Sequence, residues 1–155
     1  SGQFHSCHLK YFVMIGTLFT FSKKSDYRRS IVALSCPVIY LFFATVRTEP
    51  TERDIVKITR LRDEAHEALT ILDQHLSNQA YVCGDKFTMG DIPLGCIVYR
   101  YFNIKVDRPK LPNVEAWYQR LSERPAYRKN VMRHFGENPT DWAALEKACE
   151  SEGIT

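Results

Sequence analysis

Residues 87–92 read Phe-Thr-Met-Gly-Asp-Ile, and this stretch decides the fold. Thr88 and Asp91 have the spacing of a helix N-cap residue and its capping-box partner, while Phe87 and Ile92 have the spacing of a hydrophobic staple. The stretch therefore predicts the start of a helix, with the Asp91 carboxylate at the positive end of the helix dipole. We expect these four residues to have a structural role.

The helix that this cap opens is apolar on nearly every face. Residues 93–102 read PLGCIVYRYF, with Arg100 as the one charged side chain. A helix of this kind is buried on all sides, so we expect it at the centre of the domain. Gly95 indicates the close approach of another helix.

A long amphipathic helix is predicted before this stretch, from about Thr51 to Leu76. Thr51 and Asp54 match a capping box, which predicts Thr51 as the N-cap. His66 and His75 fall on polar positions, where we expect solvated side chains. The apolar positions have three-and-four spacing: Ile55, Ile58, Leu61, Ala65, Ala68 or Leu69, Leu72 and Leu76.

An earlier helix is predicted over residues 37–47, with Pro37 in its first turn. One face carries Val38, Leu41, Phe42 and Thr45, and another carries Tyr40, Phe43 and Arg47. Because this helix is apolar nearly all round, we expect it to face both its own core and either a partner subunit or a ligand cleft. Tyr99 and Arg100 are further polar residues that a cleft would suit, although no spacing rule distinguishes them from structural or surface residues.

Later helices are predicted after Pro112, from Pro125 and after Asn138, where Pro139 follows as the first helical residue. Residues 36–155 are thus expected to form one all-α domain with a C-terminal tail helix. Residues 1–35 differ, because the run at 11–21 is rich in aromatic and β-branched residues. We expect an atypical N-terminal segment that is irregular or partly extended.

The composition is that of one soluble domain, with 155 residues of which 45% are hydrophobic and 25% charged. The net charge of +3 is too small to indicate the basic surface that nucleic-acid-binding proteins usually have, so we expect no nucleic-acid partner. The five scattered cysteines favour reduced thiols in the cytoplasm. The two apolar runs, residues 11–21 and 31–46, are both shorter than a membrane-spanning helix, so a membrane anchor over residues 11–46 is the weaker alternative.

Motifs for phosphate, dinucleotide, serine-hydrolase or zinc-protease chemistry are absent from the sequence. Residues 5–8, His-Ser-Cys-His, have metal-ligand side chains but no second pair, so we expect no metal site.

Several motifs in order resemble the C-terminal all-helical domain of the glutathione transferase superfamily. They are the 87–92 stretch, preceded by Leu72-Asp73-x-x-Leu76 and Tyr81-Val82-x-Gly84-Asp85, then Pro112-Asn113-Val114-x-x-Trp117-x-x-Arg120-Leu121 and Arg124-Pro125-Ala126-Tyr127. The resemblance covers about residues 37–133, and residues 37–54 are similar to the first long helix and loop of some bacterial members.

The resemblance implies an enzyme family that conjugates the thiol of glutathione to small electrophiles and forms homodimers through the first two helices of this domain. It implies an electrophile site lined by the first helix and by C-terminal segments, which makes Tyr40, Phe43 and Arg47 the candidate substrate-binding residues. No membrane partner is expected.

In this family the catalytic residue and most glutathione contacts lie in a preceding thioredoxin-like domain. A single βαβ unit needs about 30 residues, and residues 1–35 contain no Val-Pro-x-Leu turn and no Glu-Ser or Gln-Ser dipeptide. We therefore expect no catalytic residue in this chain, and conjugation only in a full-length form that binds glutathione. The alternative is a non-catalytic transferase-like helical module for protein–protein assembly.

Overall fold

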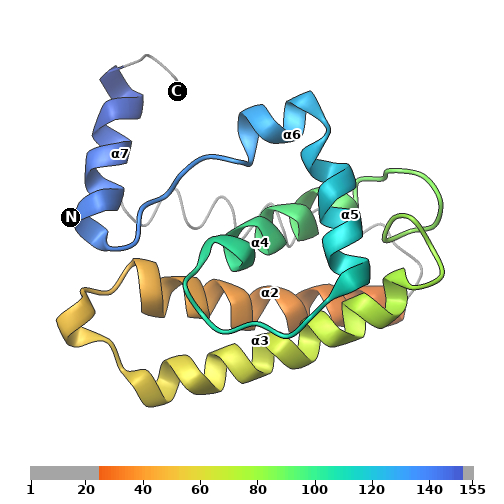
Figure 1. The fold of residues 1–155 in the computed structure, drawn as a ribbon, viewed down its shortest axis with the longest axis horizontal. Helices are drawn as coiled ribbons and strands as arrows, with labels where there is room; N and C mark the ends of the chain where they lie inside the picture. Colours follow the sequence, from red (N-terminus) through yellow and green to blue (C-terminus); the bar gives the residue numbers. More distant parts are fainter. Residues whose placement is uncertain (1–24, 152–155) are drawn as a thin grey trace.

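The computed structural model describes residues 25–151, with side chains described for residues 35–148, and this part of the chain is all-α (Figure 1). The elements are α2 (Ser25–Val46), the 3-10 helix η2 (Pro50–Glu52), α3 (Ile55–Leu76), α4 (Asp91–Asn103), α5 (Pro112–Ser122), α6 (Pro125–Asn130) and α7 (Pro139–Ser151). The predicted fold class is confirmed.

The helices form a bundle around an antiparallel pair, α2 and α3, which lie side by side (Figure 1). Helix α4 packs on α2, and α5 packs on both α3 and α4. Helix α7 lies to one side, after an extended segment that follows α6 (Figure 1). The largest fully buried side chains come from four of these helices: Trp117, Tyr101, Leu41, Leu69, Leu94 and Leu121.

The start of α2 differs from the sequence prediction. The helix begins at Ser25, so Pro37 lies in its interior and its prediction as a first-turn residue is wrong. The irregular or partly extended conformation expected for residues 1–35 is also wrong over residues 25–35, which are helical, whereas residues 1–24, with the run at 11–21, lie outside the described part. An interior proline costs a helix about 3 kcal/mol, and burial of Val38, Leu41 and Phe42 just after it offsets that cost.

The start of α3 also differs, because Asp54 and not Thr51 is its N-cap. The Asp54 carboxylate accepts a hydrogen bond from Lys57 N at 3.0 Å. Thr51 lies inside η2, and Arg53 after it is extended, so the α-helix cannot begin before this point. Ile55, predicted in the core stripe, is exposed as a result, while the stripe from Leu61 to Leu76 is buried.

Asp91 at the start of α4 is fully buried and accepts four hydrogen bonds. One carboxylate oxygen accepts from Thr88 N at 2.8 Å and Thr88 Oγ1 at 3.0 Å, and the first of these is the bond that a capping box requires. The N-cap position of α4 is nevertheless Gly90, which provides no side-chain bond, so the prediction of Thr88 as the N-cap residue is wrong by two positions. The other oxygen accepts from Val82 N and Trp117 Nε1, both at 2.9 Å. Asp91 therefore joins the loop before α4, the helix itself and α5.

Helix α4 crosses its neighbours closely at Gly95, as the sequence predicted. A Cβ on Gly95 would lie 2.8 Å from Leu121 Cδ1 and 2.9 Å from Tyr127 Cε2. The Tyr127 hydroxyl also donates to the Gly95 carbonyl at 2.7 Å. The missing side chain thus allows α5 and α6 to contact the α4 backbone.

Helix α5 is capped from another helix. Its own N-cap residue, Leu111, provides no side-chain bond, and the Asp73 carboxylate of α3 accepts from Asn113 N at 2.8 Å and Val114 N at 2.9 Å. The two elements are thereby joined at a point where the α5 dipole favours a negative charge.

Within residues 25–151, none of the helices is long and apolar enough to cross a membrane.

Candidate functional site

Two of the three substrate-binding residues predicted from the sequence lie on α2, and Arg47 directly follows its last residue, Val46, with Arg47 N donating to the Phe43 carbonyl at 3.2 Å. Tyr40 is 56% exposed, whereas Phe43 and Arg47 are half-buried. Spacings of three and four residues align them on the helix surface. Phe43 packs edge-to-face on Phe42, with ring centroids 6.0 Å apart.

Phe42 is the centre of a group of aromatic rings from α2, α4 and the C-terminal part of the chain. Its ring centroid lies 5.0 Å from that of Phe135 and 6.0 Å from that of Trp142, both edge-to-face. Tyr99 of α4 contacts Phe135 at 6.0 Å. Edge-to-face packing of this kind stabilises aromatic groups beyond the area that they bury.

Two guanidinium groups cover this group of rings. Arg47 lies over the Trp142 ring, with Cζ 4.3 Å from the centroid, and Arg100 lies over the Phe42 ring at 5.7 Å. These are cation–π distances. We call the set Phe42, Tyr99, Phe135, Trp142, Arg47 and Arg100 the aromatic–arginine cluster.

Neither arginine of the cluster has an acidic partner: among the residues with described side chains, no carboxylate oxygen lies within 4.0 Å of Arg47 or Arg100. Arg100 donates one hydrogen bond, to the Cys96 carbonyl at 3.3 Å. Burial raises the pKa of the Cys96 thiol, so this thiol stays protonated and is a poor nucleophile near neutral pH.

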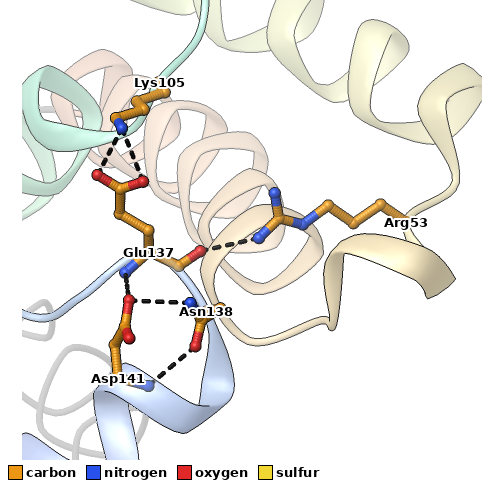
Figure 2. A network of polar contacts seen from close by, with 5 residues as sticks. All are labelled: Arg53, Lys105, Glu137, Asn138 and Asp141. Atoms are coloured by element: carbon orange, nitrogen blue, oxygen red, sulfur yellow. Dashed lines mark hydrogen bonds and ion pairs between the residues drawn. The ribbon is translucent and has the colours of Figure 1, made fainter.

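The position of Trp142 depends on a polar network at the start of α7 (Figure 2). Arg53 Nη2 donates to the Glu137 carbonyl at 2.8 Å, and Lys105 Nζ lies 2.6 Å from the Glu137 carboxylate. The two bonds connect the residues just before α3 and just after α4 to the residues just before α7.

The first turn of α7 is closed by its own cap, as the sequence predicted. Asp141 N donates to Asn138 Oδ1 at 2.9 Å, and the Asp141 carboxylate accepts from Glu137 N at 3.1 Å and Asn138 Nδ2 at 2.9 Å (Figure 2). Gly136 turns the chain into this cap with a φ of +72°. The network and cap hold the backbone one residue before Trp142.

The sequence pointed to part of this cluster. Arg47 was a predicted site residue, and Tyr99 and Arg100 were noted without a defined role. Phe135 was missed, and the prediction for Trp142 went no further than a tail helix that begins at Pro139. The cap at Asn138 allowed the helix that carries Trp142 to be predicted. The residues near this cap did not indicate which other element the helix would contact.

A second feature is a shallow depression of about 420 Å³ between α3 and the segment after α4. It is lined by Ile58, Thr59, Arg62, Lys105, Val106 and Asp107. None of the predicted site residues lies here. The two positively charged side chains that line it are already paired, Arg62 with Asp63 at 2.8 Å and Lys105 with Glu137. We therefore do not assign this depression as a binding site.

His66 corrects the expectation of a solvated side chain. It is half-buried, its ring lies edge-to-face with Tyr101 at 6.1 Å, and its Nε2 atom is buried without a hydrogen-bond partner in the described structure. Burial lowers the pKa of His66 and raises that of Tyr101 to about 12. His75 is exposed as expected, although its Nε2 lies 2.8 Å from the Val82 carbonyl.

No group of three or more histidine, cysteine or acidic side chains suited to a metal ion occurs in the described part of the chain. Residues 5–8 lie outside it.

Comparison with known proteins agrees with this architecture. Residues 32–125 match the family described as "Glutathione S-transferase, C-terminal domain". Glutathione S-transferase GstB of Escherichia coli K12 is 38% identical over 92 residues, which are 59% of this chain and 44% of the relative. Glutathione S-transferase 2 of Saccharomyces cerevisiae is 33% identical over 72 residues, which are 45% of this chain and 30% of the relative. The chain thus spans less than half the length of these curated relatives.

Solved structures show the same fold. The theta class glutathione S-transferase from Xanthomonas axonopodis pv. citri, in its apo form, is 34% identical and superimposes with a TM-score of 0.66, covering 75% of this chain and 65% of that one. The same protein solved with glutathione bound gives the same TM-score, with 60% of its chain covered. The family match extends over more than half of the present chain, which therefore belongs to the glutathione S-transferase C-terminal domain family.

Proposed function

We propose that this chain provides the electrophile-binding and dimerisation half of a glutathione transferase. Conjugation then takes place in a full-length form in which a thioredoxin-like domain binds glutathione as the co-substrate. The observation that carries this proposal is the aromatic–arginine cluster, where α2 meets the C-terminal segment of the chain. The relatives named glutathione S-transferases, one of them solved with glutathione bound, support the chemistry.

Tyr40, Phe43 and Arg47 are the proposed substrate-binding residues, and α7 completes the site through Trp142. Aromatic walls suit a planar apolar electrophile, because ligand sites are lined mainly by apolar and aromatic side chains with a few polar groups. We further propose a cytoplasmic protein.

The proposed homodimer forms through α2 and α3. These helices are adjacent, and α3 has exposed apolar side chains at Ile55, Val56 and Ile71. Exposed apolar side chains of this kind are typical of protein–protein contact surfaces.

The test is a chimera in which the thioredoxin-like domain of the E. coli relative is joined ahead of Ser25. We expect the chimera to conjugate glutathione to 1-chloro-2,4-dinitrobenzene, and the chain alone to show little turnover. The variant Phe43→Ala should raise KM for the electrophile, whereas Ile92→Ala, an exposed side chain of α4, should not.

A folded chimera that binds glutathione but neither binds nor conjugates the electrophile would refute the proposed site. Stable capture of a protein partner by such a chimera would then favour the assembly module. Robust turnover by the chain alone would show that the glutathione-binding half is not needed, which contradicts the proposal.

A further inference from the structure

The aromatic–arginine cluster has more hydrogen-bond donors than acceptors. Arg47 donates no side-chain hydrogen bond within the described structure, and Arg100 donates only to the Cys96 carbonyl. The indole Nε1 of Trp142 is buried without a partner among the described residues. A buried donor without an acceptor costs stability, so these three groups together favour an acceptor-rich ligand.

The geometry of Arg47 leaves its donors available. Its Cζ atom lies 4.3 Å from the centroid of the Trp142 ring, and this cation–π contact provides no acceptor for the N–H groups of the guanidinium. A guanidinium binds a carboxylate with two parallel hydrogen bonds. Arg47 is half-buried, so a pair formed there is less screened by water than a pair on an open surface.

Arg100 adds a second positive charge to the cluster, with its Cζ atom 5.7 Å from the ring centroid of Phe42. Within the described structure no acidic side chain lies at ion-pair distance from either arginine, so the cluster has two positive charges beside apolar rings and no carboxylate paired with them. A neutral planar ligand would satisfy the rings and leave the charges uncompensated.

We infer that the electrophile accepted by this site is an aromatic compound that carries a carboxylate. Its carboxylate pairs with Arg47, its ring packs against the half-buried side chains of Phe43 and Trp142, and Arg100 strengthens the attraction without a direct contact. This inference rests on the proposed function, since it specifies the substrate class of the same site.

The test compares two probes of equal shape, 4-chloro-3-nitrobenzoate and 4-chloro-3-nitrobenzamide, by calorimetric titration of the full chain. We expect the acid to bind about tenfold more tightly than the amide or better, as one charge-assisted bidentate pair predicts. Arg47→Gln should bring the ratio of the two affinities close to one, and Arg100→Gln should lower it about two- to threefold.

Two further variants make the comparison specific. Arg60→Gln removes the same charge from an exposed position on α3 and should leave the ratio unchanged. Trp142→Leu keeps the net charge but removes the ring under Arg47, so the ratio should fall although both arginines remain.

The outcomes separate this inference from the proposed function. Equal affinity for acid and amide, with both weakened by Phe43→Ala, would overturn the carboxylate inference and leave the electrophile site intact. A preference for the acid that survives Arg47→Gln and Arg100→Gln would overturn the assignment to this cluster. Failure of the unaltered chain to bind either probe would overturn both proposals.

Discussion

Asp91 is the residue on which the greatest number of described hydrogen bonds converge, because its buried carboxylate accepts from the backbone of two segments and from two side chains. We predict that Asp91→Ala lowers the free energy of unfolding by about 3 kcal/mol or more, since each buried donor left unpaired costs about 1–3 kcal/mol. Urea unfolding monitored by circular dichroism measures this change.

The matched control is Asp54→Ala, which removes an exposed cap with a single hydrogen bond to Lys57 N. Loss of an ordinary N-cap costs about 1 kcal/mol. Equal losses for the two variants would mean that the bonds of Asp91 to Val82 and Trp117 contribute nothing beyond the helix cap.

His66 gives the fold a dependence on pH. Burial lowers the pKa of its imidazole from the ordinary 6.5, and the charge of Arg62 acts in the same direction, while a backbone hydrogen bond with Asp107 opposes both. Since the unfolded chain then binds a proton more readily than the folded chain, stability is lost as the pH falls below about 6.5.

We therefore predict that the free energy of unfolding decreases from about pH 7 to about pH 5, and that His66→Gln shows a smaller decrease over that interval. His134→Gln, at an exposed position, is the control and should follow the unaltered chain. Identical pH profiles for the His66 variant and the unaltered chain would contradict the assignment of this effect to His66.

At the scale of whole elements, the residues that form the hydrogen bonds of two caps local in sequence were predicted correctly, a third local cap was predicted at Thr51 instead of Asp54, and the cap that comes from a distant helix was not predicted. The bonds of Asn138 and of the Thr88–Asp91 pair join residues three apart, so spacing alone identifies them. The Asp73 cap of α5 joins residues forty positions apart, and no local rule finds it.

The start of α2 shows the opposite failure, in which a local rule was followed too far. Proline favours the first helical turn, but Pro37 lies within a helix whose following residues are buried. Tertiary packing of the residues after Pro37 decides whether the helix continues through the proline. The residue types next to Pro37 do not reveal that packing.

Gly136 is the point at which the position of α7 is most sensitive to substitution. Its φ of +72° is unfavourable for other residues, and a Cβ there would lie 2.5 Å from Asp141 Cβ. We predict that Gly136→Ala displaces the start of α7 and raises acrylamide quenching of Trp142, while the buried Trp117 stays protected. Steady-state fluorescence in a Trp117→Phe background measures Trp142 alone.

The control is Gly84→Ala, because Gly84 also has a positive φ, of +124°, but no described atom lies within 4 Å of a Cβ built on it. Both variants carry backbone strain, and only the Gly136 variant disturbs the cap of α7. Equal quenching of Trp142 in the two variants would show that this turn does not position the helix.

At the scale of the whole molecule, the site residues that the sequence suggested come from one helix surface, whereas the cluster also contains residues from the C-terminal part of the chain. Tyr40, Phe43 and Arg47 share a helix surface that three-and-four spacing makes visible. Phe135 and Trp142 join the cluster only because the chain returns from α6 to the side of α2, held there by Arg53 and Glu137. Such a return depends on contacts between distant residues, so it required the structure.

The proposed dimer gives the last prediction. Val56 and Ile71 are 81% and 54% exposed and lie on the same side of α3, because fifteen residues are close to four helical turns. We predict that the chain sediments as a dimer of about twice 18.0 kDa, and that Val56→Glu or Ile71→Glu raises the dimer dissociation constant at least about tenfold. The reason is that each variant replaces apolar burial by a buried charge.

Met89→Glu makes the same change at a 67% exposed side chain that belongs to neither α2 nor α3, and should leave the dimer intact. A chain that sediments as a monomer at every concentration, or a Met89 variant that dissociates as readily as the Ile71 variant, would rule out α3 as the contact.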